Sequence, residues 1–304
     1  MLRAYVIVLF WAILSDANTA KISKRIINGE EAKPGDHPWA VSIRGMHPKF
    51  RSTTYCGATV LDKRWILTAA HCFWVGKTQQ YLMNPANWEV QAGSTQIETK
   101  FYPAVNSRIK GVNNRWLEII KTLLAGFQQK PWIGKMERIV IHPMFSPEEL
   151  EYDIAVVRLA EDLPMEYGKI AAVKLPPSKD AQIWPPPHSA CTFVGWGCKS
   201  KGAGPSPQAQ VISLNVLPNT VCSSMYNNAA GLNDEHEFCA GYYKSDIGIC
   251  SGDSGSGLIY LVQKTPYVVG VASATHADDP ESFPGLFTRV SYFVKWIKEQ
   301  TKEN

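Results

Sequence analysis

Short runs of apolar and β-branched residues, separated by turn residues, recur along most of the chain. Such runs predict β-strands, because strands are short, rich in Val, Ile, Thr and aromatic residues, and bounded by Gly, Pro, Asn, Asp or Ser. The predicted strands cover residues 39–43, 57–61, 64–68, 154–159, 191–197, 210–214 and 267–272. Many short strands with turns between them indicate an all-β protein, built as a barrel or a sandwich.

The end of the chain has helical spacing instead. Residues 291–302 carry apolar side chains at Phe293, Val294 and Ile297, which predicts an amphipathic C-terminal helix. The proline-rich run 175–187 is interpreted as a connector between two halves of the protein.

The N-terminus has the pattern of a secretory signal peptide. Arg3 precedes an uncharged apolar run over residues 4–14, and small residues follow, so we assign residues 1–17 to the signal. The run is shorter than the roughly 20 residues that a membrane span needs. We therefore expect a secreted, extracellular protein without a membrane partner, in a compartment that permits disulfides.

Composition and charge exclude some functions. The chain has 31 Lys and Arg against 27 Asp and Glu, and the leader carries most of the excess of basic residues. Because the remainder is close to neutral, we expect no nucleic-acid partner.

Three short signatures point to one kind of chemistry. His71 stands in Thr-Ala-Ala-His-Cys, Asp153 in Tyr-Asp-Ile-Ala, and Ser254 in Gly-Asp-Ser-Gly. A serine hydroxyl needs a neighbouring base to act as a nucleophile, and histidine titrates near neutrality. Each residue alone has an ordinary structural explanation, but the order His, Asp, Ser is one of the known orders of a catalytic triad. The signatures resemble those of the chymotrypsin/trypsin family, and the resemblance runs from Ile26 to about Glu299.

The resemblance implies the fold and the catalytic groups. It implies one peptidase domain over residues 26–304, built from two six-stranded antiparallel β-barrels packed together with a short C-terminal helix. It implies His71 as the base, Asp153 as the residue that orients it, Ser254 as the nucleophile, and an oxyanion hole formed by the backbone N–H groups of Gly252 and Ser254. It implies a protein or peptide substrate and no cofactor or metal.

The resemblance also implies activation by cleavage. Residues 18–25 read as a propeptide, and a cut after Arg25 would free the amino group of Ile26 to pair with Asp253. A buried carboxylate needs such a partner. An exposed dibasic site without consequence is the alternative.

The resemblance also indicates which residues line the specificity pocket, and with these residues the pocket resembles the apolar, partly occluded pocket of elastase-like members. The lining residues are Gly248, Ile249, Ser273, Thr275 and Gly285. Gly248 stands where trypsin-like members carry an aspartate, so a cationic side chain would lack its partner. We expect cleavage after small or medium apolar residues, with aromatic residues as the second choice. Such an enzyme could not readily cut after Arg25, so a separate activating protease is expected, and protein protease inhibitors are expected as further partners.

The seven cysteines match the family in part. The resemblance implies the bridges Cys56–Cys72 and Cys222–Cys239. The family partners of Cys191 and Cys250 are absent, and Cys198 is extra, which leaves one further bridge and a free thiol or an intermolecular bond. We hypothesise that Cys198 pairs with Cys250.

The cluster at 234–237 is expected to be a solvated loop, since it lacks the paired spacing of a zinc site. Ser94 stands where calcium-binding relatives carry a ligand, so no calcium site is expected there.

Two further departures from the family leave alternatives open. The catalytic motif continues with Ser256 in place of the usual glycine. A segment at about 101–134 lengthens the chain between His71 and Asp153, and apolar residues repeat at helical spacing from Trp116 to Phe127. This segment is a surface helix that binds a partner or covers a loop, a helix packed on its own barrel, or a translated intron. A catalytically silent protease homologue that acts as a binding module is the alternative to an active enzyme.

Overall fold

The computed structural model describes residues 29–46, 52–74, 82–97, 131–165, 168–178, 184–200, 202–227 and 232–302. The predicted signal peptide, the predicted propeptide at 18–25, Ile26 and the helical pattern at 116–127 lie outside these residues.

The first half of the described chain forms a closed antiparallel barrel in the strand order β2-β3-β4-β7-β6-β5. Its strands are β2 (Ala40–Met46), β3 (Thr53–Val60), β4 (Trp65–Thr68), β5 (Trp88–Ala92), β6 (Trp132–Ile141) and β7 (Ala155–Leu159). Along β5 the buried Trp88, Val90 and Ala92 alternate with partly exposed residues, which is the period of a strand with one face in the core.

The second half forms another six-stranded barrel. Its strands are β8 (Ala190–Gly195), β9 (Gln210–Leu217), β10 (Glu237–Ala240), β11 (Gly257–Val262), β12 (Thr265–Ala274) and β13 (Gly285–Arg289). The ring closes because β8 pairs with both β11 and β9, and the short β1 (Glu30–Glu31) adds to the outside of β9. The predicted pair of six-stranded antiparallel barrels is therefore confirmed.

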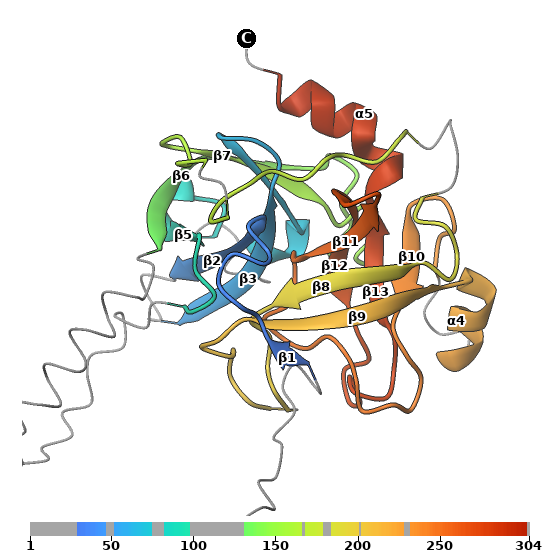
Figure 1. Ribbon diagram of the computed structural model, residues 1–304. Coiled ribbons are helices and arrows are strands. Elements are labelled where there is room, and N and C mark those ends of the chain that lie inside the picture. Colours follow the sequence, from blue (N-terminus) through green and yellow to red (C-terminus); the bar gives the residue numbers. More distant parts are fainter. Residues whose placement is uncertain are drawn as a thin grey trace, which may run out of the picture.

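Figure 1 shows the two barrels side by side, the first in blue to green and the second in yellow to red. The connector predicted at 175–187 lies between the last strand of the first barrel and the first strand of the second.

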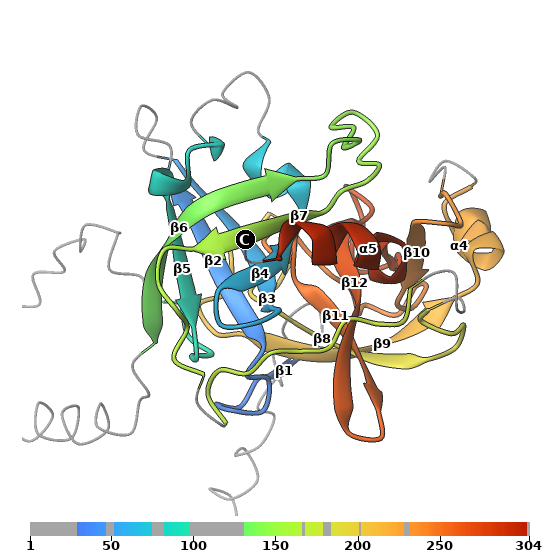
Figure 2. The same cartoon turned by 90° about the horizontal axis from the view of Figure 1, so that it is seen from above.

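The C-terminal helix α5 (Val290–Gln300) also confirms its prediction. Its apolar stripe, Val290, Phe293 and Ile297, joins the core cluster that includes the first-barrel residues Ile66 and Val157. The helix thus follows directly on β13, lies beside β12 of the same barrel, and shares a core cluster with residues of both barrels; the view from above shows its position (Figure 2). Further helical elements in the described part of the chain are α4 (Asn219–Met225), the 3₁₀ turn η1 (Ala70–Phe73) and the 3₁₀ turn η3 (Pro85–Asn87).

The structure differs from two local expectations of the sequence analysis. The end of the segment at 101–134 belongs to a barrel strand, because β6 begins at Trp132 and pairs with β5.

The expectation of a solvated loop at 234–237 is wrong for the second half of this segment. His236 is buried and its ring stacks on that of Tyr152, with the ring centroids 4.3 Å apart, and Glu237 begins β10. Tertiary packing from another part of the chain covers a polar segment that by itself suggests a loop.

Candidate active site

His71 lies just after β4, the third strand of the first barrel. Thr68 closes β4, and His71 follows in the 3₁₀ turn η1. The next residue, Cys72, is bonded to Cys56 on β3, and the Thr68 hydroxyl donates to the Gly57 carbonyl on the same strand at 2.7 Å. The turn that carries the imidazole is therefore attached to β3 by a covalent and a hydrogen bond.

Asp153 lies two residues before the start of β7 and is fully buried. The preceding Tyr152 has φ 52°, in the left-handed region that non-glycine residues rarely adopt and that recurs at functional sites. The carboxylate accepts hydrogen bonds from the His71 backbone N–H at 2.8 Å and the Ser273 hydroxyl at 2.6 Å. The Thr288 hydroxyl donates to the Asp153 carbonyl at 2.8 Å. Ser273 and Thr288 belong to the second barrel, so both barrels hold this carboxylate.

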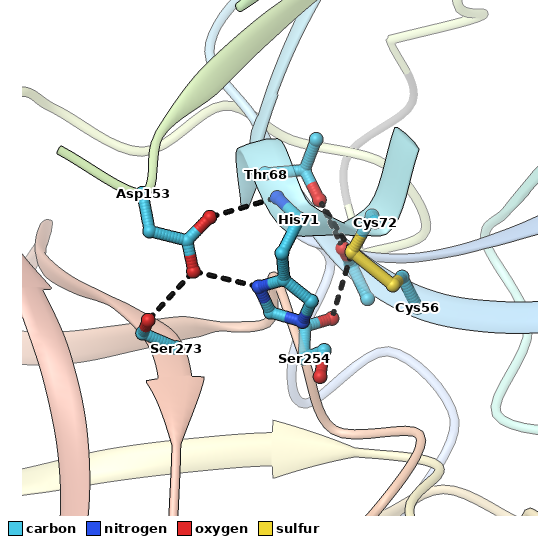
Figure 3. Close-up of a disulfide and its surroundings, with 8 residues drawn as sticks. Cys56, Thr68, His71, Cys72, Asp153, Ser254 and Ser273 are labelled. Carbon is cyan, nitrogen blue, oxygen red and sulfur yellow. Dashed lines mark hydrogen bonds and ion pairs between the residues drawn. A yellow bond between two sulfur atoms is a disulfide. The ribbon is translucent and has the colours of Figure 1, made fainter. Parts of the chain in front are cut away.

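The His71 ring and the Asp153 carboxylate form a close pair. Nδ1 lies 2.6 Å from Oδ2, and because a carboxylate only accepts, Nδ1 carries the proton and Nε2 is left as an acceptor. Burial of His71 lowers the pKa of the imidazole, but the charge of Asp153 and its hydrogen bond outweigh burial, and the pKa is raised above its ordinary 6.5. Figure 3 shows Ser254 beside the ring, on the side away from Asp153.

Ser254 lies in the loop before β11, and its backbone is bound by both barrels. Its carbonyl accepts from the Gly57 N–H at 2.7 Å, and the Gly255 N–H donates to the Ala272 carbonyl at 2.8 Å. Gly255 has φ +80°, and a Cβ there would lie 2.2 Å from Thr68 Oγ1. Glycine is therefore required next to the serine for its conformation and for its lack of a side chain.

Asp253 points away from the surface and is fully buried. Its carboxylate accepts from the Gly197 N–H at 2.8 Å and from the Cys250 N–H at 2.9 Å. Burial raises the pKa of this carboxyl to about 7, and the two backbone hydrogen bonds offset only part of that effect. A Cβ on Gly197 would lie 2.2 Å from the carboxylate, so glycine at 197 leaves the space that Asp253 fills.

A cavity of about 220 Å³ opens beside Ser254. Its walls include Ile249, Ser273 and Thr275 from the predicted specificity pocket, and the lining holds no Asp, Glu, Lys or Arg. Gly248 and Gly285 are not part of the lining. A Cβ on Gly248 would lie 2.2 Å from the Pro280 carbonyl oxygen, and one on Gly285 would lie 2.6 Å from Ile249 Cδ1, so both glycines lie behind the wall.

A second cavity, of about 470 Å³, shares Ser273 and Ala274 with the first. Its other lining residues include four carboxylates, those of Glu148, Glu149, Glu151 and Glu237. Burial raises the pKa of Glu237 above its usual range, although a hydrogen bond from the Asn233 N–H opposes this.

The cysteines form three bridges and leave one thiol. Cys56 is bonded to Cys72, Cys222 to Cys239 and Cys198 to Cys250, and Cys191 is free and buried. Burial raises the pKa of the Cys191 thiol to about 12. A buried, protonated thiol is chemically inert.

The sequence did not reveal the residues that support the site. Ser273 was assigned to the pocket wall, yet its hydroxyl also binds Asp153, and Thr288 and Gly197 were not singled out. A serine or threonine within an apolar strand is a weak signal, because its hydroxyl partner is defined only once two barrels meet. Within the described ranges no group of three His, Cys, Asp or Glu side chains is placed to hold a metal ion.

The fold and the arrangement of His71, Asp153 and Ser254 define a chymotrypsin-type architecture, and the comparison with known families agrees. The family described as Trypsin matches residues 26–115 and 119–297, so the chain belongs to the trypsin family.

Among its relatives is the rat "Transmembrane protease serine 9" (Rattus norvegicus), 30% identical over 286 residues, a match that covers 91% of this chain and 22% of the relative. The mouse "Transmembrane protease serine 7" (Mus musculus) is 29% identical over 281 residues, covering 90% of this chain and 28% of the relative. The human "Atrial natriuretic peptide-converting enzyme" (Homo sapiens) is 28% identical over 283 residues, covering 92% and 23%. The chain thus spans less than a third of the length of these relatives.

A solved structure with the same fold is the "scabies mite inactivated protease paralogue S-D1". It superposes with a TM-score of 0.68 and 22% identity, covering 90% of this chain and 95% of that one. At this identity the likeness shows the fold alone. None of the helices in the described part of this chain has the length and apolar character to cross a membrane.

Proposed function

We propose that the chain is a secreted serine endopeptidase in which His71, Asp153 and Ser254 act as the catalytic triad. The observation that carries the proposal is the buried Asp153 carboxylate, which accepts from His71 Nδ1 at 2.6 Å and from Ser273 at 2.6 Å. This arrangement orients the imidazole with Nε2 available toward Ser254, and it stabilises the imidazolium that forms during the reaction.

In the proposed reaction His71 Nε2 removes the proton of the Ser254 hydroxyl as the serine oxygen attacks the scissile carbonyl. His71 then gives the proton to the leaving amine, and the acyl-enzyme is hydrolysed by water in a second, similar step. The backbone N–H groups of Gly252 and Ser254 would bind the oxyanion. Gly252 has φ +98°, a conformation that suits glycine and sets the direction of its N–H.

The proposed preference is for small or medium apolar residues before the cleaved bond. Ile249 and the Cys198–Cys250 bridge give the 220 Å³ cavity an apolar wall, and Thr275 contributes bulk. Because the lining carries no carboxylate, a Lys or Arg side chain would be buried there without a charge partner.

The proposed activation step is cleavage after Arg25 by another protease. The supporting observation is the raised pKa of Asp253, since a carboxylate buried among neutral groups gains from a neighbouring ammonium such as that of Ile26.

A serine-directed fluorophosphonate probe tests the proposal. The purified chain is cut after Arg25 with trypsin, which is then removed, and the probe is added before and after the cut. We expect labelling of Ser254 after cleavage, none in the Ser254→Ala variant, and hydrolysis of peptides with Ala, Val or Leu before the scissile bond in preference to Arg. An unlabelled, inactive cleaved chain would support the silent binding module instead.

A further inference from the structure

The bridge between Cys198 and Cys250 joins two segments that the active site needs to hold in place. Cys198 comes shortly after β8, and Cys250 precedes Ser254 in the loop that leads to β11. Both cysteines are buried, their Cα atoms are 5.4 Å apart, and both line the 220 Å³ cavity together with Ser254.

The same two segments are also joined by hydrogen bonds. The Cys198 N–H donates to the Ser251 carbonyl at 2.9 Å, directly before Gly252. The Asp253 carboxylate accepts from Gly197 on one segment and from Cys250 on the other. A Cβ on Gly252 would lie 3.3 Å from the Gly197 Cα, so the backbone that carries the proposed oxyanion donor packs directly on the segment that Cys198 anchors.

The two kinds of connection, the hydrogen bonds of Asp253 and the disulfide, differ in how far they depend on charge. The Asp253 connection depends on a buried carboxyl with a pKa of about 7, whose charge is costly without a cation nearby. The disulfide needs no charge and closes a loop of 52 residues, which restricts the motion of both segments.

We infer that the Cys198–Cys250 bridge is a positioning element for the oxyanion hole: it holds Gly252 and Ser254 against the Gly197 segment. This inference rests on the proposed function. The bridge acts through the backbone of the loop and touches no reacting atom, so its loss would weaken interactions made with the tetrahedral intermediate more than interactions made by the substrate side chain in the cavity.

The test compares two inhibitors on the variant C198A/C250A. A peptidyl aldehyde forms a tetrahedral adduct with Ser254 and places its oxygen in the oxyanion hole, whereas the matching peptide alcohol only fills the cavity. We expect the inhibition constant of the aldehyde to rise about tenfold more than that of the alcohol. This fold-change is smaller than the loss caused by removing an oxyanion donor outright, about 10²–10³ in kcat, because the donors are loosened and not deleted.

The matched control is C222A/C239A, which removes a bridge between α4 and β10. We expect the ratio of the two inhibition constants to stay unchanged in this variant. Equal weakening of aldehyde and alcohol in C198A/C250A, or the same change of ratio in the control, would overturn the inference. Wild-type protein that neither hydrolyses peptides nor binds the aldehyde better than the alcohol would instead refute the proposed function.

A second measurement covers the case in which C198A/C250A does not fold. Wild-type enzyme is treated briefly with a water-soluble phosphine, and mass spectrometry identifies which bridge is open. The phosphine gives two electrons to the disulfide and becomes its oxide with oxygen from water, while the sulfurs take up two protons. We expect the aldehyde-to-alcohol ratio to change in step with reduction of Cys198–Cys250. A ratio that stays constant as this bridge opens would contradict the inference.

Discussion

At the scale of single residues, Asp153 is the point where the local chemistry depends most on distant parts of the chain. Its carboxylate and carbonyl receive hydrogen bonds from His71, Ser273 and Thr288, which come from both barrels. The signature around Asp153 could be recognised from the sequence alone. Its partners Ser273 and Thr288 could not be assigned that way, because a hydroxyl on a strand has no visible partner until the barrels pack.

Replacement of Ser273 by alanine removes one donor from a buried carboxylate. We expect Ser273→Ala to lower kcat/KM at least about tenfold, since a hydrogen bond to a charged group contributes about 1.5–3 kcal/mol. Steady-state kinetics on an apolar peptide substrate measure this. Ser273→Thr keeps the hydroxyl and should retain most of the activity, and a full loss in both variants would point to the pocket wall instead.

The raised pKa of His71 predicts the acid limb of the pH profile. His71 acts as a base only when neutral, so activity is lost as the pH falls through its pKa. Because that pKa lies above 6.5, the limb in kcat/KM should have its midpoint above pH 6.5. Rates measured between pH 5 and 9 on the cleaved enzyme test this, and a midpoint below 6.5 would contradict it.

At the scale of elements, the loop between residues 248 and 257 combines most of the special features of the site. It carries the proposed nucleophile, the proposed oxyanion donors, the buried Asp253 and one half of a bridge. The sequence indicated the chemistry of this loop. It did not show that Gly197 and Cys198 form the other side, because the two segments are separated by about fifty residues and meet only through the folding of the second barrel.

Asp253 should make the stability of the uncleaved chain depend on pH. Its folded pKa of about 7 lies above the ordinary 3.8, so between these values the folded chain binds more protons than the unfolded chain. The free energy of unfolding should therefore fall as the pH rises from 4 to 7, by about 3 kcal/mol from this group. Urea unfolding of the uncleaved Ser254→Ala variant measures the slope, and adding Asp253→Asn should remove most of it, whatever the effect on absolute stability.

At the scale of the whole molecule, the two barrels are joined at the candidate catalytic groups. Thr288 of β13 binds the Asp153 carbonyl, and Gly57 of β3 donates to the Ser254 carbonyl. Helix α5 adds a third connection, because its buried side chains belong to a core cluster that contains residues of both barrels. Residues of the site are therefore also residues of the barrel interface.

Thr288→Val tests this double role. The change keeps the shape of a buried side chain but leaves the Asp153 carbonyl without its donor, so we expect a loss of about 1–2 kcal/mol in the free energy of unfolding. Urea unfolding in the Ser254→Ala background measures it. The control Thr53→Val alters an exposed threonine on β3 and should change stability by less than about 0.5 kcal/mol. Equal effects of the two changes would argue against a supporting role for Thr288.

The sequence by itself determined the family, the pair of barrels, the C-terminal helix and the positions of the three candidate catalytic residues. The strands, the helix and the signatures depend on local patterns that keep their meaning wherever they lie, whereas the pair of barrels was implied by the family that the signatures resemble. Only the tertiary structure decided which hydroxyls bind Asp153, which glycines line the cavity, and that His236 is buried. The physical reason is that hydrogen-bond partners and burial depend on which segments come together in space, and a strand pattern specifies a face to be buried without specifying what covers it.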